Sequence, residues 1–210
     1  MSILAVFAII AGLVSLLSLL TLHFTSPEFQ PSWRMVSEYA NGKFKWLLTV
    51  FFYMWGASSI LLALHLFPLV TGFWPLFGVG MLILSGIGAI CGGLFDINHK
   101  KHGLAFALGV PTLPVAAVIL TYHLLDTGLI TQSNALILAH GSWVSILLMA
   151  TSMMLLFAGF KKAGIVMDKN TPPPTELPKG VIAIAGYANR LLVSCFIAWT
   201  IYIAYLLLQY

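Results

Sequence analysis

Charged side chains are scarce in this sequence of 210 residues, where Asp, Glu, Lys and Arg together make up 8% of the chain. A soluble domain carries about 25%, so a soluble fold of this length would have too few charges to cover its surface. Apolar residues account for 60% of the chain, and the mean hydropathy is +0.99. These values indicate a protein whose solvent is the lipid bilayer.

Cysteine is also rare, and the common signatures of soluble enzymes are missing. Cys91 and Cys195 both fall inside apolar runs, where buried thiols are expected and not a disulfide. We find no P-loop, no dinucleotide fingerprint, no GxSxG elbow and no lipidation motif. The net charge of +4 does not indicate nucleic-acid binding, because the basic residues lie in short loops beside apolar runs. We therefore predict no cofactor and no nucleic-acid partner, and we do not favour an enzymatic role.

Several apolar segments are long enough to cross a bilayer, which requires about 20 residues. The first segment is uncharged and lacks the basic start of a signal peptide, so we expect it to be a retained helix. The sequence predicts an all-α fold, a single bundle of six transmembrane helices at residues 2–24, 46–68, 73–95, 103–125, 136–160 and 183–208.

The Lys and Arg residues are distributed very unevenly between the two sides of this bundle. All ten lie in the connections 25–45, 96–102 and 161–182 or, in the case of Arg190, in the first turns of the last helix. The other side carries both termini and the two remaining connections, without Lys or Arg. The positive-inside rule therefore predicts that the basic face lies in the cytoplasm and that both termini lie on the extracytoplasmic side.

The third and fourth predicted helices contain residues that affect helix packing. Gly88 and Gly92 form a GxxxG pattern, which lets helix backbones approach closely. We expect the third helix to pack at the centre of the bundle or against a second copy of the chain, as a homo-oligomer. Pro111 and Pro114 each remove an amide donor from the fourth helix and predict a kink, satisfied by neighbours such as Thr112. The alternative is a broken helix that lines the site of a small solute transporter.

The principal candidate site consists of polar residues at the basic face: Glu38, Asp96, His102 and Arg190. Arg190 precedes three apolar residues, so it points into the membrane boundary and is expected to need a carboxylate partner, Glu38 or Asp96. The structural interpretation is an ion pair that ties loops to a helix. The functional interpretation is a pocket in which Arg190 binds the phosphate or carboxylate of a lipid headgroup or small anion. A catalytic alternative uses Asp96 or Glu38 as base and His102 as acid.

Three histidines, His65, His123 and His140, are predicted at similar depth near the opposite face, each on a different helix. Neutral imidazoles at one depth could bind zinc or copper, and two of them could ligate a haem. However, no spacing places two of them on one helix, and nearby Trp and Tyr residues fit an interfacial aromatic belt. We favour interfacial histidines bonded to backbone carbonyls, with a metalloprotein or b-type haem protein as the alternative.

Several short motifs resemble those of a family of prokaryotic integral membrane proteins known as "domain of unknown function 998". They are Ser37-Glu38-Tyr39, Gly93-Leu94-Phe95-Asp96, His102, Asn189-Arg190-Leu191 and Trp199. The resemblance covers nearly the whole chain and implies a multi-span bundle of similar size, which we expect in a bacterial cytoplasmic (inner) membrane. It implies no activity, but it places the shared polar residues at the basic face. We therefore expect an anionic ligand or lipid headgroup to bind there.

Overall fold

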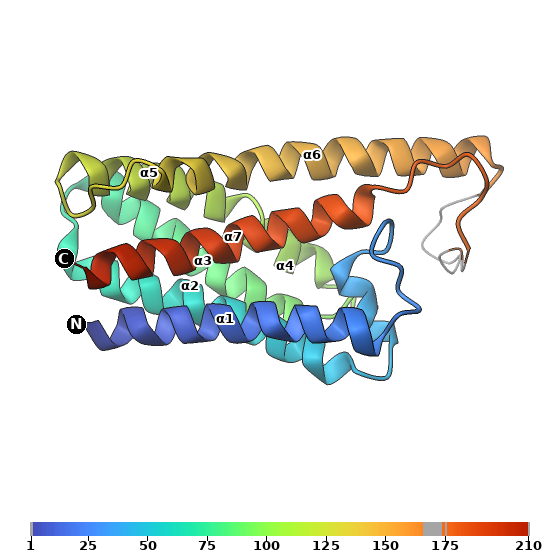
Figure 1. The fold of residues 1–210 in the computed structure, drawn as a ribbon, viewed down its shortest axis with the longest axis horizontal. Coiled ribbons are helices and arrows are strands. Elements are labelled where there is room, and N and C mark those ends of the chain that lie inside the picture. Colours follow the sequence, from blue (N-terminus) through green and yellow to red (C-terminus); the bar gives the residue numbers. More distant parts are fainter. Residues whose placement is uncertain (1, 166–173, 175, 210) are drawn as a thin grey trace.

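The computed structural model describes residues 2–165, 174 and 176–209, and in this part of the chain it contains helices and no strand. Two short 3-10 helices, η1 (Val36–Asn41) and η2 (Phe67–Leu69), flank the second long helix. The α-helices run in one elongated bundle (Figure 1) and are α1 (Ser2–Thr25), α2 (Lys45–Leu66), α3 (Phe73–Leu94), α4 (His102–Gly109), α5 (Thr112–Asp126), α6 (Ala135–Lys162) and α7 (Ala185–Leu208).

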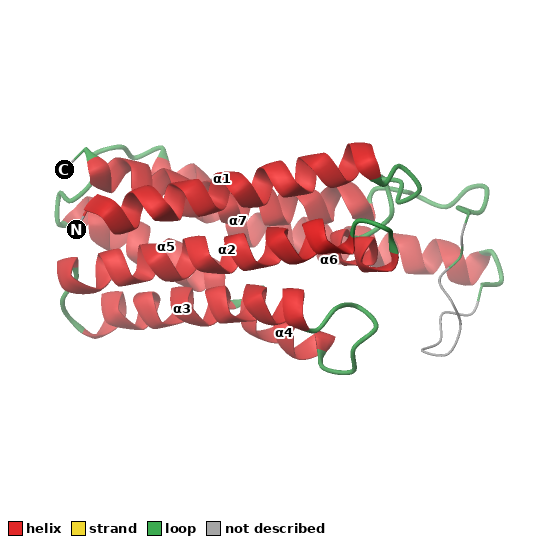
Figure 2. Cartoon of the chain, turned by 90° about the horizontal axis from the view of Figure 1, so that it is seen from below, coloured by secondary structure: helices red, strands yellow, loops and turns green. Residues whose placement is uncertain are grey.

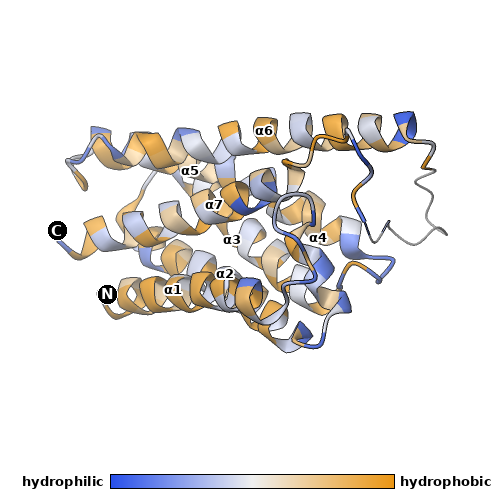
Figure 3. Ribbon diagram, turned by 45° about the vertical axis from the view of Figure 1, so that its right-hand side comes forward, coloured by the Kyte–Doolittle hydropathy of each residue, from blue (hydrophilic) through white to orange (hydrophobic). Residues whose placement is uncertain are grey.

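The predicted all-α architecture is confirmed. Six helical segments are long and apolar enough to cross a membrane, and α4 and α5 together, His102–Asp126, form one of them. Every predicted boundary lies within two residues of an observed helix end, if η2 is left out and α4 and α5 are taken together. Hydrophobic residues predominate along the helices (Figure 3), and many large apolar side chains are exposed on the outside of the bundle. The protein is therefore a multi-pass membrane protein.

The two ends of the bundle differ in charge. Both termini lie at one end, which we call the terminal end, together with the connections from α2 to α3 and from α5 to α6 (Figures 1 and 2). The opposite end carries the connections from α1 to α2 and from α3 to α4, and the end of α6 (Figure 2). We call it the basic end, because the described Lys residues lie there. This arrangement agrees with the predicted separation of the charges.

The fourth predicted helix is divided into α4 and α5 at Val110 and Pro111. Pro111 lacks an amide hydrogen and cannot continue the hydrogen-bond ladder of α4. The Thr112 hydroxyl donates to the carbonyl oxygen of Leu108 at 2.5 Å, and the Ser85 hydroxyl on α3 donates to that of Gly109 at 3.1 Å. The carbonyl oxygens of Leu108 and Gly109 beside the break thus accept from Thr112 and from a hydroxyl of α3.

The third helix is not central: α3 packs closely against α2 and against the span formed by α4 and α5, whereas α7 contacts α1, α2, α5 and α6. A Cβ atom on Gly86 would lie 2.8 Å from the carbonyl oxygen of Gly56 on α2, and one on Gly88 would lie 2.3 Å from the backbone nitrogen of Gly109 on α4. Side chains larger than hydrogen are therefore incompatible with the observed separation of these helices. Contact between two copies of the chain through α3 stays a prediction.

Candidate ligand pocket at the basic end

Arg190, in the second turn of α7, is 9% exposed and binds backbone at the basic end. Its Nη1 donates to the carbonyl oxygens of Arg34 at 2.7 Å, Gly186 at 3.0 Å and Pro31 at 3.3 Å. Its Nη2 donates to the Tyr39 hydroxyl at 3.1 Å. One guanidinium therefore fixes the connection between α1 and α2 against the start of α7.

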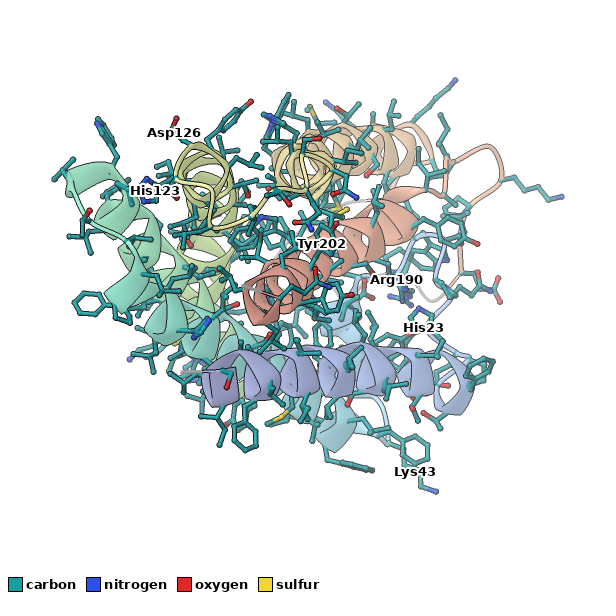
Figure 4. The ribbon with its side chains drawn as sticks, turned by 60° about the vertical axis from the view of Figure 1, so that its left-hand side comes forward. His23, Lys43, His123, Asp126, Arg190 and Tyr202 are labelled. Atoms are coloured by element: carbon teal, nitrogen blue, oxygen red, sulfur yellow. The ribbon has the colours of Figure 1, made fainter. Side chains whose placement is uncertain are left out.

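The Nε of Arg190 donates to Nε2 of His23 on α1 at 2.6 Å, and Figure 4 shows these two side chains pointing toward each other. The Nδ1 of His23 lies 2.6 Å from the carbonyl oxygen of Leu19, which can only accept, so Nδ1 carries the hydrogen. Nε2 then holds a lone pair and accepts from Arg190. The first and last helices are thus joined by a hydrogen bond between a cation and a neutral imidazole.

The prediction that Arg190 pairs with Glu38 or Asp96 is wrong, because among the described residues Arg190 forms no ion pair with a carboxylate. Glu38 instead pairs with Arg34, with 2.6 Å between Oε2 and Nη1, and Asp96 pairs with Lys45. Arg190 does not need a carboxylate here, because three carbonyls, a phenol and an imidazole satisfy its donors. Its role in the structure is to hold the loop in place.

Asp96 anchors the connection between α3 and α4. One carboxylate oxygen accepts from Lys45 at the start of α2, and the other accepts from the backbone N–H of Asn98 at 2.9 Å. The hydrogen bond from the Lys45 ammonium lowers the pKa of Asp96 below its ordinary value. The carboxylate therefore stays charged at neutral pH, and the stabilisation from this pair is lost only when the pH falls through the lowered pKa.

Asp96→Asn is expected to reduce the free energy of unfolding at neutral pH by less than about 1 kcal/mol, because the pair with Lys45 is partly exposed to solvent. Thermal unfolding in detergent at pH 7 measures the difference between the variant and the wild type. The difference should shrink as the pH falls below the pKa of Asp96, since the wild type then loses the same charge. A loss of several kcal/mol would mean that Asp96 has another partner.

A cavity of about 260 Å³ lies among the helices near the basic end and is mostly apolar. We call it the apolar chamber. Phe106 on α4 lines it and is 51% exposed, so the chamber reaches the lipid-facing surface. The walls of the apolar chamber include Ser37, Phe52, Trp55, His102, Ala105, Phe106, Met149, Met153 and Asn189.

A second cavity of about 340 Å³ lies next to the first, because Met35 and Met153 line both. Its lining is also mostly apolar, and we call it the polar chamber because the charged residues Arg34 and Glu38 line it. Besides these two methionines, its walls include Trp33, Arg34, Glu38, Asn41, Asn98, Phe157 and Phe160. Its polar groups come from η1 and from the connections beside it, whereas its apolar wall comes mainly from α6.

Arg34 is the main charged group of the polar chamber and is 9% exposed. Its Nη1 binds Glu38, its Nη2 donates to the carbonyl oxygen of Pro174 at 2.9 Å, and its guanidinium lies 4.1 Å from the centre of the Trp33 ring. Its Nε is buried and has no hydrogen-bond partner in the described part of the chain. A donor of this kind needs an acceptor to offset the cost of its burial.

The structure separates the four predicted site residues. Glu38 lines the polar chamber and His102 the apolar chamber, whereas Asp96 and Arg190 line neither. The sequence did not single out Arg34 as a pocket residue. In the sequence, Arg34 follows Trp33 and precedes the apolar residues Met35 and Val36, a pattern that is also typical of an anchor at the membrane interface.

The three histidines at the terminal end are not gathered into one group. His140 on α6 accepts from Trp143 Nε1 at Nδ1, 2.9 Å away, and its Nε2 lies 3.1 Å from the Tyr122 hydroxyl. His65 is buried on α2, and His123 lies on α5 beside Asp126 (Figure 4). Among the described residues, no group of three or more His, Cys, Asp or Glu side chains could hold a metal ion. Haem ligation by two of the histidines stays the alternative interpretation.

These features define a class: a multi-pass membrane protein of six spans, with the described Lys and Arg residues at one end of the bundle. A family model described as "Protein of unknown function (DUF998)" matches residues 9–206, and the chain belongs to this family. The resemblance carried by the short motifs is thereby confirmed. No curated protein and no solved structure matches the chain.

Proposed function

We propose that this protein binds an anionic membrane lipid, with the headgroup in the polar chamber and an acyl chain in the apolar chamber. The observation that carries the proposal is the contact between the two chambers at Met35 and Met153. Arg34 and Glu38 line one chamber, whereas no Lys, Arg, Asp or Glu of the described residues lines the other. A single lipid likewise has a charged headgroup at one end and an apolar acyl chain at the other.

The location of the chambers supports a ligand that comes from the bilayer. Phe106 and Phe157 line one chamber each and are 51% and 44% exposed on the outside of the bundle. Transfer of an acyl chain from bilayer to chamber brings little hydrophobic gain, because both surroundings are apolar. Affinity would therefore come mainly from the headgroup.

Charge favours an anionic headgroup over a zwitterionic one. Exposed lysines surround the basic end, among them Lys43, Lys101 and Lys162, and each basic residue near a membrane surface attracts anionic lipid by about 1 kcal/mol. Arg34 lines the polar chamber, and its buried Nε, which has no partner in the described part of the chain, would donate to a phosphate oxygen that reaches it. By the positive-inside rule this end faces the cytoplasm of a bacterial cell, so the lipid would come from the inner leaflet of the inner membrane.

Filling the apolar chamber should prevent lipid binding. Ala105 on α4 lines the chamber and is 5% exposed, so a phenyl ring in Ala105→Phe would occupy the space of the acyl chain. Ala107, on the same helix, is exposed and does not line the chamber. Ala107→Phe is therefore a matched control with the same added volume directed at bulk lipid.

The experiment equilibrates each purified protein with mixed micelles of phosphatidylglycerol and phosphatidylcholine, then washes it and quantifies retained lipid by mass spectrometry. The wild type and Ala107→Phe should retain phosphatidylglycerol in preference to phosphatidylcholine. Ala105→Phe should retain at least about tenfold less phosphatidylglycerol than the wild type, because overpacking of the chamber costs about 1–3 kcal/mol. Equal retention by the two variants, or no retained lipid in the wild type, would refute the proposal.

A further inference from the structure

Asn189 presents a hydrogen-bond donor to the apolar chamber. The backbone N–H of Val36 donates to its side chain at 2.8 Å, so the atom that faces Val36 is the amide oxygen. The NH₂ group therefore points elsewhere, and its one contact among the described residues is the sulfur of Met149 at 3.6 Å. A thioether is a weak acceptor, which leaves the donors of Asn189 available to a ligand.

Two further donors belong to the same chamber. Trp55 is 4% exposed, and its indole Nε1 is buried without a hydrogen-bond partner in the described residues. The half-buried Ser37 hydroxyl makes no hydrogen bond to the part of the chain that the structure describes. Buried donors are nearly always satisfied in native proteins, so a donor left over beside a cavity indicates an acceptor that comes from outside the chain.

His102 adds an acceptor in its neutral form. Its Nδ1 lies 2.8 Å from the carbonyl oxygen of Phe95 and therefore carries the hydrogen, which leaves a lone pair on Nε2. Within the described ranges, no Lys, Arg, Asp or Glu lines the apolar chamber. A carboxylate or phosphate would be buried here without a counter-charge, which is costly. The acceptor that fits this chamber is uncharged.

We infer that the apolar chamber recognises an uncharged carbonyl group on an apolar molecule, with the Asn189 amide as the principal donor. Two membrane components carry such a group beside a long hydrocarbon chain, namely ester-linked lipids and prenylated quinones. This inference rests on the proposed function and narrows it, because the acyl chain would be recognised through its ester carbonyl as well as accommodated.

The test compares lipids that differ only in the carbonyl. Purified protein is equilibrated with equal amounts of ester-linked and ether-linked phosphatidylglycerol of the same chain length, and retained lipid is quantified by mass spectrometry. The wild type should enrich the ester form about three- to tenfold, as one net hydrogen bond provides. Asn189→Asp keeps the acceptor for Val36 but loses the amide donors, so it should retain both lipids equally.

A parallel sample contains a prenylated quinone in place of the ester lipid. Enrichment of the quinone over the ether lipid, lost in Asn189→Asp, supports carbonyl recognition with the quinone as its source. Equal retention of ester and ether lipids by the wild type, with no quinone bound, overturns the inference and leaves the proposed lipid binding intact. No retention of any lipid overturns both. If Asn189→Asp does not fold, Trp55→Phe replaces it, because this variant keeps an aromatic ring and removes the indole donor.

Discussion

Arg190→Met should lower the free energy of unfolding of the solubilised protein by about 3–5 kcal/mol, because each buried acceptor left without its donor costs about 1–3 kcal/mol. Methionine has a similar length but no donors. The substitution therefore leaves the carbonyl oxygens of Pro31, Arg34 and Gly186 without the guanidinium that now binds them. Thermal unfolding in a mild detergent measures the loss.

Two matched variants test whether the geometry of the guanidinium is responsible. Arg190→Lys keeps the charge, but one ammonium group cannot reach His23, Tyr39 and the three carbonyls together, so its stability should lie between those of the wild type and Arg190→Met. Lys162→Met removes an exposed cation at the same end of the bundle and should change stability by no more than about 0.5 kcal/mol. If Arg190→Met unfolded at the wild-type temperature, the hydrogen bonds of Arg190 would not contribute to stability.

Gly88→Ala should lower the free energy of unfolding by about 2–3 kcal/mol through overpacking between α3 and α4. The added Cβ would lie 2.3 Å from the backbone nitrogen of Gly109 and 2.8 Å from the carbonyl carbon of Leu108. Both atoms belong to the backbone, so no rotamer change relieves the clash and α4 must move away from α3. Because α4 carries Ala105 and Phe106, this movement should also reduce lipid retention.

Gly80→Ala is the control on the same helix. No atom of the described residues lies within 4 Å of the position that its Cβ would occupy, and alanine is favoured over glycine in a helix by about 0.5–1 kcal/mol. This variant should therefore be as stable as the wild type or slightly more stable. Equal stability of Gly88→Ala and Gly80→Ala would show that α4 does not depend on close contact with α3.

The spans could be predicted because each one follows from local composition. A helix that crosses the bilayer must be about 20 residues long and apolar, whatever it packs against. Pro111 predicted a kink in the fourth span in the same way, and the structure divides this span into two helices there. The close contacts of α3 with α2 and α4 were also predictable, since glycines at helical spacing indicate such contacts, whereas its place at the edge of the bundle was not. These features depend on few long-range contacts.

The partners of Arg190 could not be predicted because they belong to the tertiary structure. They include backbone carbonyls more than 150 residues away in the sequence, and a carbonyl group leaves no trace in a residue pattern. An expectation based on side chains alone therefore assigned a carboxylate. The same limit applies to the chambers: Met149 and Met153 are one helical turn apart on α6, which is equally typical of an ordinary helix contact.

The hydrogen bond between His23 and Arg190 has a consequence for biosynthesis. It joins α1 to α7, and α1 leaves the ribosome well before α7. Until α7 enters the membrane, the loop carbonyls that Arg190 binds must find their donors in water or in lipid headgroups. The basic end can therefore reach its final form only after synthesis of the sixth span, and a nascent chain that stops before this span presents an unclosed polar surface at the membrane boundary.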